Sequence, residues 1–520
     1  MRMTNKIMRN NSLYNINQNK MLEDKLTNQM TTQSKIARPS DDPVVAIRAL
    51  RLRSNVTYVT QYYEKNAADA GQWLSMTSDA LTTIGDILKN LYEKATGAAD
   101  KDLTADDLDI ILTQMKSLTH EFYASGNVDY AGRYIFSGYR TDTAITFSAD
   151  DIAEMKKHPS SFEIKEKLGY ADIDSFYFTD YETLSTDIDD GAGNVTDGIR
   201  PDGTSYEQDI TNTKMYRLRL AYDDLDTDDI NANNLSVSFK HGNNPFTPPT
   251  IVEYDDAEAA YRDVANGAVR MAYIPSTGEL VFSEDYYDTL HEVDNFEISY
   301  TKSNWIEGDI NPVHYFECTE TRDIGGGRTK EIGYNKDGIT TLPQDIYYDV
   351  GFNQKIQVNT LASDVFTHNV QRDMDDFQRC ITQLRGIETE IYDIEKKMAD
   401  YPEDSDEYKN LAQKKAAAEK ARTYIRENIH TQFENQITKY QNYLDDANVA
   451  DTNNASRGSR LDLISKRLMN QQATFKDLQT DNESIDVTQA AVELTSSEMI
   501  YQAALLATSK IMQTNLMNYI

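Results

Sequence analysis

The stretch TTQSKIARPSDDPVVAIRAL, residues 31–50, interrupts a helix-rich N-terminus and then restarts it. Its centre is a run of turn and capping residues: Arg38, Pro39, Ser40, Asp41, Asp42 and Pro43. Pro39 disfavours helical backbone in the residue before it, and Ser, Asp and Asn are the preferred N-caps. Pro43 suits a first helical position, where a missing N–H costs nothing. The sequence therefore predicts a sharp break followed by a strongly nucleated helix.

Helical patterns flank this break on both sides. Residues 5–36 form an amphipathic but Asn- and Gln-rich pattern, which is marginal as an isolated helix. From Pro43 to about Ala95, apolar residues recur at three- and four-residue steps, which is typical of a coiled-coil stripe. A further helix of about 20 residues follows a capping-type start before residue 105. The first quarter of the chain is therefore expected to be almost entirely helical.

The middle of the chain, residues 140–360, has a β pattern. Residues 233–240 and 295–301 alternate apolar and polar side chains, and MAYIPSTGELVFS, residues 271–283, reads as a β-hairpin. A short helix is expected near residues 255–265. We therefore expect a mainly β domain with long acidic loops, of which residues 189–205 are one.

Helical periodicity returns near residue 361. Residues 366–446 suggest a helical hairpin, and the turn-forming residues 445–456 suggest a loop after it. Another helix follows, NESIDV interrupts it near residue 483, and a last helix runs from about residue 486 to the end. The chain thus has long helices, then strands, then long helices.

This order predicts an α+β fold, in which long helices from both termini pack as a bundle around a central, mainly β, outer domain and an extra helical hairpin. The expected segments are 1–42, 43–139, 140–360, 361–483 and 484–520.

Composition restricts the function. The formal net charge is -33 and the pI about 4.6, which opposes general binding to nucleic acid. Residues 1–60 carry ten Lys and Arg against four Asp and Glu, so the acidity lies downstream. No apolar run is long enough for a membrane span, and the N-terminus lacks the apolar core of a cleavable signal peptide. Two cysteines make a disulfide framework or a multi-cysteine zinc site improbable.

Four stretches resemble a known family. RMTNKIMRNNSLYNINQNKMLEDKLTNQMTTQSKIARPSDDPVVAIRAL resembles the N-terminal segment of the flagellin superfamily. YAGRYIFSGYRTDTAITF, RGSRLDLISKRL and ESIDVTQAAVELTSSEMIYQAALLATSKIMQTNLMNYI resemble the hook–filament junction branch of that superfamily. The matched regions are about residues 2–147 and 455–520, in the order that the family requires.

The resemblance implies that segments 1–42 and 484–520 pair as an inner coiled coil of a tubular polymer. The break at residues 38–43 would then be the loop between the inner helical layer and the next one. The implied assembly residues are Ile7, Leu13, Ile16, Leu22, Leu26, Leu494, Tyr501, Leu505, Met512 and Leu516. The implied role is an extracellular adaptor of the bacterial flagellum, exported without a cleavable signal.

The implied partners are flagellin, another hook-associated protein, further copies of the chain in a ring zone and an export chaperone, with no nucleic acid and no membrane insertion.

Three alternatives remain open from the sequence. The chain could be a filament flagellin, its Tyr-rich β block could bind a surface or a glycan, or it could be an enzyme. No H-E-x-x-H pair, phosphate loop or catalytic constellation is visible, so catalytic, cofactor and metal sites are all expected to be absent. Asp189, Asp190 and Asp197 match no EF-hand spacing and read as a solvated acidic loop.

Overall fold

The computed structural model of the chain describes residues 5–100, 103–184, 188–189, 195–196, 206–227, 235–241, 244–335 and 344–513. The chain divides into two compact units. Unit 1 comprises Met1–Gln72, Tyr347–Ile356 and Arg457–Ile520, and unit 2 comprises Trp73–Ile346 and Gln357–Ser456. Long terminal helices and central sheets give the α+β class that the sequence predicts.

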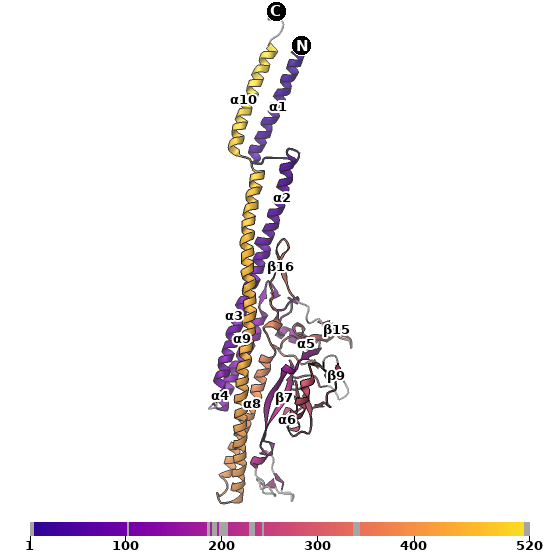
Figure 1. Cartoon of the computed structure of the whole chain (residues 1–520), viewed down its shortest axis with the longest axis vertical. Coiled ribbons are helices and arrows are strands. Elements are labelled where there is room, and N and C mark those ends of the chain that lie inside the picture. Colours follow the sequence, from indigo (N-terminus) through magenta and orange to yellow (C-terminus); the bar gives the residue numbers. More distant parts are fainter. Residues whose placement is uncertain are drawn as a thin grey trace, which may run out of the picture. The chain divides into compact units, whose positions relative to one another are not determined.

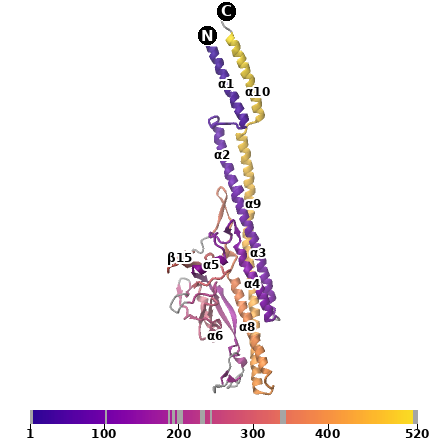
Figure 2. The same ribbon diagram turned by 180° about the vertical axis from the view of Figure 1, so that it is seen from behind.

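Unit 1 is built from both ends of the chain. Its elements are α1 (Asn5–Thr32), α2 (Pro43–Thr60), η1 (Gln61–Ala67), the hairpin β16 (Tyr347–Gly351) and β17 (Gln354–Gln357), the end of α9 (Asp406–Glu483) and α10 (Val487–Gln513). Helices α1 and α10 lie side by side in both views (Figures 1 and 2). The expected helix 5–36 ends at Thr32, because Gln33 adopts a left-handed φ of 53°.

The helix expected from Pro43 onward continues through α2 and η1 into α3 (Ala68–Ala98). Its middle is a seven-residue π-helical stretch, η1, that the apolar periodicity did not indicate. Long π-helical stretches are rare and often mark functional positions in helices. The hairpin β16–β17 packs against this stretch within unit 1.

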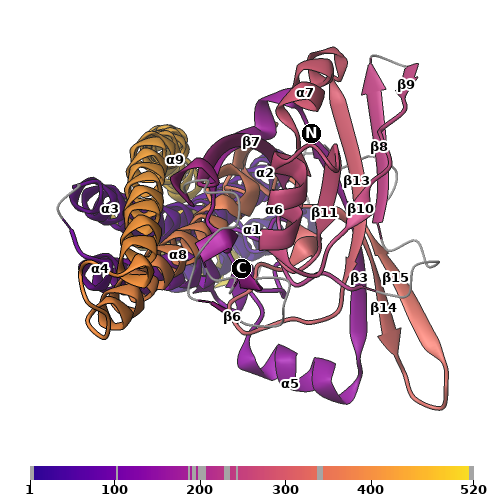
Figure 3. The ribbon, with the colours of Figure 1, turned by 90° about the horizontal axis from the view of Figure 1, so that it is seen from below.

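Unit 2 contains a helical part on one side of its strands (Figure 3). This part consists of α3, α4 (Ala105–Ala124), α8 (Asn369–Met398) and the first part of α9. The apolar stripe expected on residues 374–394 is buried along α8, where Phe377 stacks on Phe433 of α9 at 4.1 Å between ring centroids. Thr104 caps α4 through a capping box with Asp107, as the sequence predicts.

The loop expected at residues 445–456 is wrong, because α9 runs unbroken from Asp406 to Glu483. Tertiary contacts override the weak local helix propensity of this Asn- and Asp-rich segment. Asn454 is buried and donates to the carbonyl of Leu74 at 2.8 Å, and Ser78 Oγ donates to Asp451 Oδ1 at 3.0 Å.

The described strands of unit 2 form two larger sheets and two small ones. The five-stranded sheet has the order β10 (Val252–Glu253), β11 (Met271–Ile274), β12 (Glu279–Phe282), β7 (Thr211–Arg219) and β4 (Ile173–Asp180). The six-stranded sheet has the order β15 (Thr329–Tyr334), β14 (Glu317–Asp323), β3 (Ser160–Leu168), β13 (Asn295–Lys302), β8 (Leu235–His241) and β9 (Asn244–Phe246).

The remaining described pairs are β1 (Asp129–Tyr130) with β2 (Arg133–Tyr134), and β5 (Ile188–Asp189) with β6 (Val195–Thr196). Three short helices complete unit 2: α5 (Ala149–Lys157), α6 (Ala257–Ala265) and α7 (Glu284–Tyr287). The hairpin expected at residues 271–283 is confirmed as the antiparallel pair β11–β12. The short helix expected at residues 255–265 is α6.

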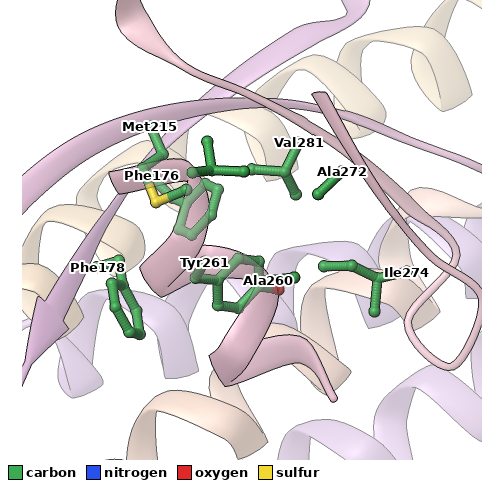
Figure 4. Packing of buried hydrophobic residues seen from close by; sticks show 9 residues of the cluster. Phe176, Phe178, Met215, Ala260, Tyr261, Ala272, Ile274 and Val281 are labelled. Atoms are coloured by element: carbon green, nitrogen blue, oxygen red, sulfur yellow. The ribbon is translucent and has the colours of Figure 1, made fainter. Parts of the chain in front are cut away.

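One face of the five-stranded sheet packs against α6 (Figure 4). Phe176, Phe178 and Met215 contribute from the strands, and Ala260 and Tyr261 contribute from the helix. The same face of β7 also carries buried arginines. Arg217 and Arg219 follow Met215 at two-residue steps, so all three side chains point to one face of the strand.

These charges join the sheet to α8. Arg217 donates to Glu279 of β12 at 2.8 Å and to Asp376 of α8 at 2.5 Å. Arg219 contacts Asp376 at 2.8 Å and Asp373 at 2.7 Å. The two sheet arginines and their acidic partners are all buried or nearly so, so the β part of unit 2 is fixed to its helices by a buried ion network.

Candidate assembly surface

The pairing of α1 with α10 follows heptad spacing. On α1, less exposed residues include Ser12, Ile16, Asn19, Glu23, Leu26 and Met30. On α10, they include Ala490, Leu494, Ser497, Tyr501, Ala504 and Thr508. Both sets alternate steps of four and three residues, which is the seam pattern of a coiled coil. The sequence reading named only the large apolar members of this seam, because its other members are small or polar.

The predicted assembly residues fall into two groups. Ile16, Leu26, Leu494 and Tyr501 lie in the seam, whereas Ile7, Leu13, Leu22 and Leu505 are exposed. Met512 lies in α10, but its side chain and all of Leu516 lie outside the described residues.

The outer faces of the helix pair carry further exposed apolar residues that the sequence reading did not single out. They are Met8, Tyr14 and Met21 on α1, and Val492, Met499, Ile500 and Leu506 on α10. An open groove of about 640 Å³ runs beside the seam, lined by Lys20, Met21 and Asp24 of α1 and by Tyr501 of α10. The helix pair thus places its small residues inside and much of its large apolar surface outside.

The break at residues 38–43 is a hydrogen-bonded loop. Asp41 Oδ2 accepts from the amides of Ala37 at 3.1 Å and Arg38 at 2.9 Å, and the Arg38 amide lowers the pKa of the Asp41 carboxyl. Asp42 is the N-cap of α2: its Oδ1 accepts from the amides of Val44 at 2.9 Å and Val45 at 3.1 Å. Pro43 occupies the first turn, as the sequence predicts. Ser40 and Pro39 are exposed at the tip.

The C-terminal chain breaks at the same place. Ser34 and Ser484 form an isolated antiparallel bridge, the Lys35 amide donates to the Glu483 carbonyl at 2.8 Å, and the Ile485 amide donates to the Gln33 carbonyl at 3.2 Å. The break between α1 and α2 is therefore paired, strand-like, with the break between α9 and α10.

A bidentate ion pair secures this crossing. Arg53 of α2 donates to the two carboxylate oxygens of Glu483 at 2.8 and 2.6 Å, and these bonds lower the pKa of the Glu483 carboxyl. Asn482 Nδ2 donates to the Val45 carbonyl at 3.2 Å. The end of α9, next to the second break, is thus tied to α2 at Val45 and Arg53.

Other chemistry was sought among the described residues. They contain no group of three His, Cys, Asp or Glu side chains placed to hold a metal ion, and none of their helices is long and apolar enough to cross a membrane. Cys318 and Cys380 are both free thiols. Asp190, Asp197 and the side chain of Asp189 lie outside what the structure describes, as does the rest of the acidic loop 189–205 apart from strand β6.

Known proteins are similar to this chain in the N-terminal region that contains α1 and the break at residues 38–43. Residues 3–141 match the family model of the bacterial flagellin N-terminal helical region. The chain is 32% identical over 117 residues to flagellar hook-associated protein 3 of Escherichia coli strain K12, covering 22% of this chain and 37% of the relative. The same protein of Salmonella typhimurium strain LT2 is 31% identical over 121 residues, covering 23% of this chain and 38% of the relative.

The chain therefore spans less than two fifths of the curated relatives that it matches. A solved structure of Xanthomonas campestris FlgL covers 82% of this chain and 98% of that chain at 12% identity, with a TM-score of 0.27, which is too low to add to the argument. The family match includes the break at residues 38–43 and the helices on both sides of it. Residues 3–141 of this chain are therefore similar to the N-terminal helical region of bacterial flagellins.

Proposed function

We propose that the chain is a structural adaptor of the bacterial flagellum that joins the hook to the filament. The observation that carries this proposal is the paired crossing of both termini at residues 33–35 and 483–485, within a flagellin-type N-terminal region. The homology to hook-associated protein 3 favours the junction role over a filament flagellin.

The exposed apolar side chains support assembly through unit 1. Most of the large apolar residues that are exposed in the described chain belong to this unit, and those of unit 2 are scattered singly. Contiguous exposed apolar surface marks interaction sites. The outer faces of α1 and α10 would be buried by neighbouring copies in a tube.

The layers follow from the same reasoning. Segments 1–42 and 484–520 would form the inner layer, segments 43–139 and 361–483 would form the next layer, and segment 140–360 would face outward. The break at residues 38–43 would separate the first two layers.

The neighbours of a junction zone differ at its two ends. Copies of this chain would contact one another around the tube, another hook-associated protein on the hook side and flagellin on the filament side. The chain would reach this place by flagellar export without a cleavable signal, held by a chaperone beforehand. The role is mechanical and uses matched helical surfaces in place of a catalytic site.

The outer face of α10 offers a test. We expect Leu505→Ser combined with Leu506→Ser to leave cells with hooks but few filaments, because both side chains are exposed in the chain and would be buried only on assembly. Motility and electron microscopy of a strain carrying only the variant would measure this. Val449→Ser, at a similarly exposed position of α9 in unit 2, is the matched control and should swim normally. Normal filaments on the double variant would contradict the proposal.

A further inference from the structure

The tip of the β16–β17 hairpin carries an exposed phenylalanine. Phe352 is 92% exposed, more than any other large apolar side chain in the described part of the chain. Turn positions normally favour Gly, Asn, Asp or Ser, and the next residue, Asn353, supplies the left-handed φ of 59° that this turn needs. The fold of unit 1 therefore gives no reason for a Phe side chain at this position.

The hairpin is held firmly against the helical run of unit 1. Asn66 of η1 donates to the Asp349 carbonyl at 2.7 Å, and Tyr348 OH bonds to Asp69. Arg467 of α9 bonds to Gln354 on the second strand. These contacts fix the base of the hairpin, so Phe352 is presented on a rigid support, which lowers the entropy cost of any contact that it makes.

A second apolar feature of unit 1 is also without a partner in the chain. Val44, Ile47 and Leu50 on the first turns of α2 are 67%, 55% and 66% exposed. With Arg48 and Arg51 beside them at helical spacing, they form a surface that we call the α2 stripe. Apolar side chains flanked by guanidinium groups suit an aromatic ring, because Arg can also stack on its face.

Phe352 cannot reach the α2 stripe of its own chain. The hairpin is attached at Asn66, and 19 residues of helix separate Asn66 from Ile47, or roughly 28 Å at 1.5 Å per residue. The tip points toward the start of α2 (Figures 1 and 2), but the three residues from Asp349 to Phe352 extend only about 10 Å. The exposure of both features agrees with this separation.

We propose that Phe352 packs on the α2 stripe of a second copy of this chain. This inference rests on the proposed function, since it names one contact through which copies associate in the flagellum. Phe352 and the α2 stripe lie at different places on one unit, so a contact between them in two copies would be heterologous. Repetition of a heterologous contact gives a ring or a helical array. An array of this kind is what a zone of copies around a tube requires.

Site-directed cross-linking tests the contact in assembled flagella. A strain without the native gene would express two copies with different tags, one with Phe352→Cys and the other with Ile47→Cys. After oxidation of isolated flagella, we expect a dimer that contains both tags. The matched control replaces Ile47→Cys by Tyr392→Cys, a 65% exposed position on α8, and unsubstituted copies give the background of Cys318 and Cys380.

A signal with Ile47→Cys about tenfold or more above that with Tyr392→Cys is expected, and equal signals would overturn the inference. In parallel, Phe352→Ser should lower incorporation into flagella about tenfold or more, the range that burial of one Phe implies, whereas Tyr392→Ser should not. Circular dichroism checks that both variants fold.

The two proposals can fail separately. If unsubstituted copies are absent from the hook–filament region, the proposed function falls and this inference falls with it. If unsubstituted copies are present there and Phe352→Ser incorporates equally well, this inference alone is overturned.

Discussion

At the residue scale, Asp42 fixes the start of α2. Its carboxylate accepts two amide hydrogen bonds that would otherwise lack partners in the first turn. We expect Asp42→Ala to lower the free energy of unfolding by about 0.5–2 kcal/mol, the usual value of an N-cap. Thermal unfolding of the purified chain would measure it. Ser40→Ala in the same loop is the control, with an effect within about 0.5 kcal/mol, and equal effects would argue against capping.

Asp376 is the centre of the buried ion network of unit 2. Although burial opposes its charge, Arg217, Arg219 and Arg379 hold the pKa of the Asp376 carboxyl well below its usual range. We expect Asp376→Ala to cost about 3–5 kcal/mol of unfolding free energy, because it removes the carboxylate that the three arginines share and leaves their buried positive charge incompletely compensated. Denaturant unfolding would measure the loss.

The exposed pair Lys409–Asp406, at 3.5 Å, provides the control for that substitution. Asp406→Ala should change the unfolding free energy by less than about 1 kcal/mol, as is usual for surface pairs. A similarly small loss for Asp376→Ala would show that the network contributes little.

Glu166 makes stability depend on pH. Burial raises the pKa of its carboxyl from about 4.5 to about 7, despite hydrogen bonds from Tyr300 and from the Ala221 amide at 2.9 Å. The folded chain therefore binds a proton between these two pH values that the unfolded chain has lost, so stability falls as pH rises from about 4.5 to 7. Full ionisation would cost roughly 3 kcal/mol.

The variant Glu166→Gln should lose this part of the pH dependence. Unfolding free energies of both proteins at several pH values between about 4.5 and 8 would measure the difference. As pH rises from about 4.5 to 7, the unfolding free energy of the unsubstituted chain should fall relative to that of the variant. Parallel curves would contradict a raised pKa of Glu166.

At the element scale, the terminal helices are held weakly within one chain. In the described part of α1, only Ile16 and Leu26 are buried apolar residues, and the seam of α10 is mostly small or polar. Helices with so little packing are marginal in water. We expect the amides of α1 and α10 to exchange rapidly with deuterium in the monomer and to become protected in assembled flagella.

The amides of α3 and α8 serve as the internal reference for that exchange experiment, because both helices are packed into the core of unit 2. Strong protection of α1 and α10 in the monomer, comparable to that of α3 and α8, would show that the pair is stable before assembly.

The elements show what the sequence could predict. Apolar periodicity predicted the terminal helices, the α8 stripe and the β11–β12 hairpin, since local pattern determines them. It failed at residues 445–456, where Asn454 and Asp451 bond to residues more than 370 positions earlier in the chain. It also missed part of the α1–α10 seam, because a reading by apolar residues passes over Ser, Asn, Ala and Thr at heptad positions.

At the scale of the whole molecule, both units are assembled from distant parts of the chain. The break at residues 38–43 could be predicted from capping chemistry, but its pairing with residues 483–485 could not, because no local signal links them. The ion network likewise joins β7 to α8 across 159 positions. From the sequence, only the resemblance of both ends to one family indicated that the two ends pair.

The location of the chain in the cell tests the proposed junction role most directly. Immuno-gold electron microscopy with an antibody against residues 150–350 would show where the outer part of the chain lies in intact flagella. We predict gold in a short band between hook and filament. Gold along the whole filament would instead identify a filament flagellin and contradict the junction role.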